Sequence, residues 1–84
     1  MTADTEESVN SAIRKDITEG EYMLDHLKER LNEFEEEHGM DSEEFMQKFN
    51  SGKLGDKEDF FEWYAVIQSI KHLEQKTENL KKKA

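Results

Sequence analysis

The sequence predicts an all-α fold, a long antiparallel helical hairpin of coiled-coil character with a short helix at the bend. Three observations support this prediction. The 84-residue chain has no proline, and 39% of its residues are charged, with glutamate and lysine prominent among them. Apolar residues repeat at helical spacing along its first half. Three of the four glycines and most of the aromatic residues fall within residues 38–63, which marks the bend.

The first helix is predicted at about residues 5–38. Asp4 is suited to cap it, and Glu7 three residues later completes a capping box. Steps of three and four residues define a heptad seam, made of Ile17, Gly20, Leu24, Leu27, Leu31 and Phe34. Three further apolar residues are expected to widen it, namely Val9, Ile13 and Met23. Gly20 is either a point of close approach to a neighbouring helix or a weak position in the seam.

A short second helix is predicted at about residues 42–51. On each side of it lie a residue suited to end one helix and a residue suited to cap the next. Gly39 suits the left-handed residue that ends the first helix. Asp41 is a good N-cap, and Met40 and Phe45 are spaced to form a hydrophobic staple around it. Gly52 is expected to end the second helix, and the loop after it contains Leu54, Gly55 and Asp56.

The third helix is predicted at about residues 57–80, with Asp56 as its cap and residues 1–4 and 81–84 frayed at the chain ends. Its later half carries a narrow apolar stripe of Ile70, Leu73, Thr77 and Leu80. Its first half, from Phe60 to Ile70, spreads apolar residues over an arc of roughly 220° at about 100° per residue. Packing against one helix uses about half of such an arc.

The apolar excess on the third helix has three interpretations. The short helix covers it, with Phe45 and Phe49 meeting Phe60 or Phe61. Alternatively, part of it stays exposed as a docking patch with an acidic rim, whose predicted members are Asp56, Glu58, Asp59, Phe61, Glu62, Tyr64 and Ile67. In the third interpretation, two hairpins pair as a homodimer and form a four-helix bundle.

The charge of the chain is strongly negative and unevenly distributed. The formal net charge is −9, and residues 33–62 hold eleven acidic residues against three lysines. Such a field repels nucleic-acid phosphate and anionic membranes, so no direct binding to either is expected, and it attracts a basic protein partner. The alternative interpretation is that the acids serve solubility alone.

The sequence offers no convincing catalytic, cofactor or metal site, so we expect a protein that is not an enzyme. Glu35 and His38 have the spacing of a di-iron ligand pair, but a second pair is missing, and Glu35 is expected on a solvated face. Asp56, Glu58 and Asp59 lack the spacing of a calcium loop. With no cysteine, no signal peptide and no membrane-length apolar run, the expected location is cytoplasmic.

The stretch HGMDSEEFMQKFNSGKLGDKEDFFEWYA, read as a unit, resembles a family of small prokaryotic, often archaeal, helical proteins. The family pattern is YGM-x-x-x-x-F-x-x-x-F-x-x-G-x-LGD-x-x-D-F-F-EW. The matching residues are Gly39, Met40, Phe45, Phe49, Gly52, Leu54, Gly55, Asp56, Asp59, Phe60, Phe61, Glu62 and Trp63. His38 replaces the usual tyrosine, and the match covers roughly a third of the chain. Members resemble antitoxin components that act beside small ribonuclease-type toxins, although many are uncharacterised.

Two hypotheses of function follow. In the first, implied by the resemblance, the chain is an antitoxin-type interaction protein that binds a basic, ribonuclease-like partner around residues 56–67. In the second, it is a self-associating helical module without a dedicated toxin partner. A change of Phe61 and Tyr64 to serine separates the two, because the first hypothesis predicts lost binding with a retained fold.

Overall fold

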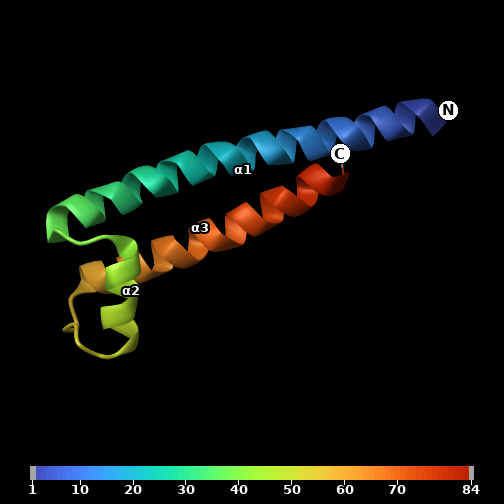
Figure 1. Ribbon diagram of the computed structural model, residues 1–84. Helices are drawn as coiled ribbons and strands as arrows, with labels where there is room; N and C mark the ends of the chain where they lie inside the picture. The colour runs from blue at the N-terminus through green and yellow to red at the C-terminus, as the bar shows by residue number, and fades with distance from the viewer. Residues whose placement is uncertain (1, 84) are drawn as a thin grey trace.

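The computed structural model describes the backbone of residues 2–83 and the side chains of residues 8–83. Its three helices are α1 (Thr2–His38), α2 (Ser42–Asn50) and α3 (Glu58–Lys83). Helices α1 and α3 run antiparallel along each other, and α2 lies at the bend beside the start of α3 (Figure 1). The molecule measures 60 × 21 × 17 Å. The described residues confirm the all-α class, and the packing of α1 against α3 is that of a hairpin.

The helix boundaries differ from the predicted ones by a few residues. Helix α1 already includes Thr2 and α3 continues to Lys83, so the described parts of both predicted frayed ends are helical. Three lysines in the last turn of α3 favour this extension, because cations stabilise a helix C-terminus. The predicted capping box of Asp4 and Glu7 lies outside the described side chains. Lys57, not Asp56, directly precedes α3.

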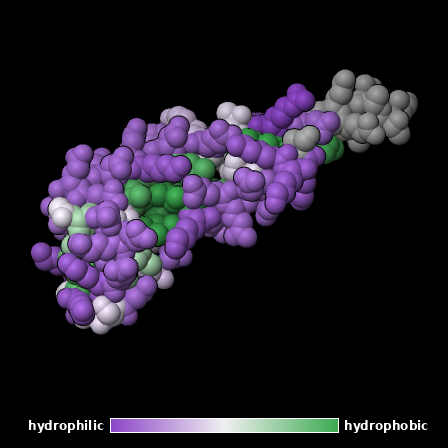
Figure 2. All heavy atoms as spheres, viewed as in Figure 1, coloured by the Kyte–Doolittle hydropathy of each residue, from purple (hydrophilic) through white to green (hydrophobic). Residues whose placement is uncertain are grey.

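The core is a narrow seam between the two long helices that widens at the bend. Its buried apolar residues are Leu24, Phe34, Phe45, Phe60, Trp63, Val66, Ile67 and Ile70. Figure 2 shows apolar surface along this seam, surrounded by a face that is mostly hydrophilic. The predicted widening of the seam in α1 is wrong for Val9 and Met23, which are 52% and 55% exposed. Helix α1 packs against a single long helix, which covers one stripe of it and not a wider arc.

Gly20 marks a close approach of α1 to α3. A Cβ atom added to Gly20 would lie only 2.8 Å from the Thr77 hydroxyl oxygen, and Thr77 is buried. Real Cβ atoms do not come this close to a neighbouring atom, and the β-branched threonine side chain has little freedom to move aside. The glycine therefore sets the spacing of α1 and α3 at this level.

Gly20→Ala should destabilise the hairpin although alanine is the better helix former. Alanine gains about 1 kcal/mol of helix propensity over glycine, whereas overpacking at a tight contact costs about 1–3 kcal/mol. Thr77→Ala removes the obstructing hydroxyl, so in that background Gly20→Ala should become stabilising. Urea unfolding followed by circular dichroism measures both changes. Stabilisation by Gly20→Ala in both backgrounds would show that the contact does not limit the approach.

Candidate interaction surface at the bend

An aromatic cluster joins all three helices at the bend. Trp63 of α3 is fully buried, and its ring stacks on Phe45 of α2 at 4.0 Å and on Phe34 of α1 at 5.6 Å between centroids. Phe60 lies 6.0 Å from Phe45 in a tilted arrangement. The predicted contact of the short helix with the third helix is thus confirmed. Contacts within one chain therefore cover most of the aromatic rings near the bend.

Local signals place α2 against this cluster. Gly39 has φ 63°, the left-handed conformation that ends α1, and Met40 packs against the core. Asp41 caps α2 as predicted, because its carboxylate accepts a hydrogen bond from the Glu44 backbone N–H at 2.8 Å. The indole N–H of Trp63 donates to the Ser42 hydroxyl at 3.0 Å. The polar edge of Trp63 is therefore satisfied by the first residue of α2.

The predicted exposure of Glu35 is wrong. The sequence placed it on a solvated face of α1, but its side chain accepts a hydrogen bond from the Ser42 backbone N–H at 2.7 Å and is half-buried. The first N–H groups of a helix have no partner within the helix, and a carboxylate there is also favoured by the helix dipole. Glu35 thus fastens the start of α2 to the end of α1.

The predicted docking patch is only partly at the surface. Phe61 is 55% exposed and touches Phe49 edge-on, with 6.0 Å between the ring centroids. Tyr64 is half-buried, since its ring stacks on Phe49 at 4.8 Å. Ile67 is only 7% exposed and belongs to the core, so its inclusion in the patch was wrong. Phe61 is the one large apolar side chain of residues 38–67 that the structure leaves exposed.

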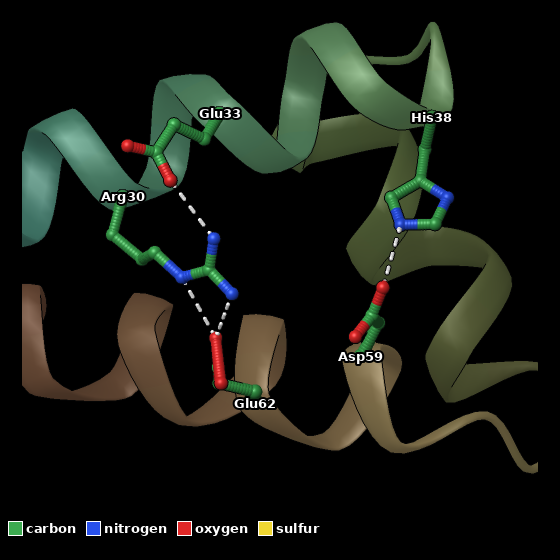
Figure 3. Close-up of polar contacts among 5 residues, drawn as sticks. All are labelled: Arg30, Glu33, His38, Asp59 and Glu62. Atoms are coloured by element: carbon green, nitrogen blue, oxygen red, sulfur yellow. Dashed lines mark hydrogen bonds and ion pairs between the residues drawn. The ribbon is translucent and has the colours of Figure 1, made fainter.

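The predicted acidic rim divides into free and paired carboxylates. Asp56 and Glu58 are exposed, and neither side chain forms a hydrogen bond or ion pair within the described part of the chain. Glu62 is paired, because Arg30 Nε donates to its Oε2 at 2.8 Å (Figure 3). Arg30 also donates through Nη1 to Glu33 at 2.9 Å. The hydrogen bonds to Glu62 and then Glu33 raise the pKa of Arg30 above its usual value.

His38 lies where the end of α1 meets the start of α3. Its ring is near Phe34, Phe60 and Trp63, with 5.4 Å between its centroid and that of Trp63. Its Nε2 atom is buried and has no hydrogen-bond partner, because the Asp59 carboxylate lies 3.8 Å away (Figure 3). A buried polar atom without a partner costs about 1–3 kcal/mol. The helical spacing in the sequence paired this histidine with Glu35, so its position beside Asp59 was not predicted.

Comparisons with known proteins find no family model, no curated protein and no solved structure that matches this chain. The family resemblance therefore stays a prediction from the motif. Within residues 2–83, the structure has no helix that is both long and apolar enough to cross a membrane. Most apolar positions of the motif have a role in packing. Phe45, Phe60 and Trp63 are buried, and Met40, Phe49 and Leu54 are partly buried against the core.

Proposed function

We propose that this chain is a non-enzymatic interaction protein of the antitoxin type, which binds a basic, ribonuclease-like protein through the acidic bend. The docking surface consists of Phe61 with Asp56, Glu58, Asp59 and Glu62 around it. This surface is smaller than the sequence predicted, because Ile67 is buried and Tyr64 is half-covered by Phe49.

The observation that carries the proposal is the exposure of Phe61. The cluster at the bend encloses Phe34, Phe45 and Trp63 completely, yet leaves more than half of this neighbouring ring in contact with solvent. An exposed aromatic side chain on a rigid helix is the type of residue that anchors protein interfaces, because it buries a large area at a small cost in conformational entropy. Phe61 packs on Phe49 and is therefore held in place before a partner binds.

The charge around Phe61 favours a basic partner. Asp56 and Glu58 are exposed nearby in the sequence, and the whole segment of residues 33–62 has eleven acids against three lysines. Complementary charge raises the rate of association and selects against acidic proteins. Proteins that cleave RNA tend to be basic because their substrate is a polyanion. An acidic surface with an aromatic anchor is suited to cover such a site.

Self-association is the alternative, and a separate observation favours it. Tyr22 and Met23 of α1 are 67% and 55% exposed, far from the bend along the hairpin. A second copy of the chain packed along this face would bury both side chains and produce the predicted four-helix bundle. The two proposals therefore place the interface on different surfaces. A probe at one position on each surface distinguishes them.

Site-specific photo-crosslinking tests the proposal. A photoreactive phenylalanine analogue replaces Phe61 in one variant and Tyr22 in the other, and both are irradiated in the cells that produce the chain. The proposal predicts that position 61 captures a basic protein, identified by mass spectrometry, whose RNA cleavage the purified chain inhibits. Capture of a second copy at position 22, with no basic protein at position 61, would instead support self-association.

A further inference from the structure

We propose that Glu37, His38 and Asp59 form a binding site for a divalent transition-metal ion of the Zn²⁺ type. Glu37 and His38 belong to the last turn of α1, and Asp59 belongs to the first turn of α3. Each offers one ligand atom, and the three atoms lie within 4.8 Å of one another. This site shares Asp59 with the docking surface proposed around Phe61, but it rests on different observations and does not depend on that proposal.

The unpartnered nitrogen of His38 is the observation that points to a ligand. Nε2 is buried and faces the Asp59 carboxylate, whereas the other ring nitrogen faces away from it (Figure 3). The 3.8 Å separation of Nε2 from Asp59 Oδ2 is too long for a hydrogen bond, which spans about 2.7–3.2 Å. The contacts of the ring with Phe60 and Trp63 hold Nε2 in this direction.

The spacing fits two ligands of one metal ion. Zinc binds imidazole nitrogen at about 2.0–2.1 Å and carboxylate oxygen at about 2.0–2.2 Å, so two tetrahedral ligands lie about 3.4 Å apart. A shift of about 0.4 Å in the Asp59 carboxylate closes the remaining gap. Asp59 is able to move because its side chain is 47% exposed, and Glu37 is exposed as well.

The ligand types select the class of ion. One imidazole with two carboxylates suits Zn²⁺ and similar first-row ions, whereas Mg²⁺ and Ca²⁺ prefer oxygen ligands alone. The three side chains leave a fourth position of a tetrahedral site for water. Such an ion would connect the end of α1 to the start of α3 and so tighten the bend. It would also give His38 Nε2 the partner that it lacks.

Zinc titration of the full chain in excess Mg²⁺ tests the site, because Mg²⁺ occupies sites made of surface carboxylates alone. We expect one saturable Zn²⁺ per chain by calorimetry, with a change in Trp63 fluorescence, since His38 stacks on this ring. Long-range ¹H–¹⁵N spectra should show Zn²⁺ shifting the His38 Nε2 signal and leaving His26 and His72 unchanged.

Three variants and two controls make the test specific. Loss of a second-shell partner already weakens metal sites about 10–100-fold, so His38→Phe, Asp59→Asn and Glu37→Gln should each weaken binding by at least about tenfold. The controls His72→Phe and Glu36→Gln change exposed residues outside the cluster and should bind as the wild type does. Asp59→Asn and Glu37→Gln keep the test valid if His38→Phe fails to fold. Absence of saturable binding, or equal affinity in the variants and the controls, would overturn the proposal.

Discussion

Trp63→Ala should remove a large part of the free energy that keeps the chain folded. Removal of a fully buried tryptophan costs about 3–5 kcal/mol. A chain of 84 residues has a total stability of about 4–13 kcal/mol, and a narrow core places this protein towards the lower end. The substitution removes several contacts at once, because Trp63 stacks on Phe34 and Phe45 and donates a hydrogen bond to Ser42.

Urea unfolding followed by far-UV circular dichroism measures this effect. Trp63→Phe is the matched variant, since it keeps an aromatic ring and loses the indole N–H, and it should cost much less than alanine. Phe61→Ala is the second control, because this ring is more than half exposed. An unfolding midpoint for Trp63→Ala equal to that of the wild type would mean that Trp63 does not organise the bend.

Phe61→Ser should weaken partner binding by about 30-fold or more while the chain stays folded. Loss of an anchoring aromatic residue at an interface costs about 2 kcal/mol or more, which is about a 30-fold loss of affinity. Within the chain, the substitution removes the edge contact between Phe61 and Phe49. An aromatic pair of this kind contributes only about 0.5–1.5 kcal/mol to the stability of the fold. Binding should therefore fall far more than stability does.

Tyr22→Ser is the matched control for Phe61→Ser. Tyr22 is also an exposed aromatic residue on a long helix, but it lies on α1 away from the bend. Calorimetry with the captured partner should give wild-type affinity for Tyr22→Ser and weak or no binding for Phe61→Ser. Equal losses in the two variants, or full binding by Phe61→Ser, would be incompatible with a docking surface at Phe61.

The turns could be predicted from the sequence because their signals are local. Gly39 has the left-handed φ expected of a residue that ends a helix, and Asp41 caps the next helix through the Glu44 N–H. Such features depend on a few neighbouring residues and on backbone sterics. The helical character and the bend were therefore accessible from the chain alone.

The exposure of individual residues on α3 could not be predicted in the same way. Tyr64 and Ile67 share a helix with Phe61, and their coverage depends on the position of α2 and on the pairing of α3 with α1. The close approach of Gly20 to Thr77 likewise depends on residues far apart in the sequence. Helical periodicity defines a face, but not how much of that face a second helix covers.

The polar contacts of Glu35 and His38 were missed for a related reason. Both side chains reach beyond the end of α1, Glu35 to the backbone of Ser42 and His38 towards Asp59. Spacing along one helix relates only residues three or four positions apart, so it pairs Glu35 with His38 and neither of them with a residue beyond the turn. The direction in which the chain turns after Gly39 decides their actual partners.

A single chain encloses the aromatic rings at the bend and leaves Phe61 exposed to solvent. Trp63 fluorescence, recorded with iodide as quencher over a wide range of protein concentrations, tests this claim most directly. Because Trp63 is fully buried within its own chain, we predict a blue-shifted emission that resists quenching at every concentration. An emission that shifts to the red and becomes quenchable on dilution would show that a second chain is needed to cover these rings.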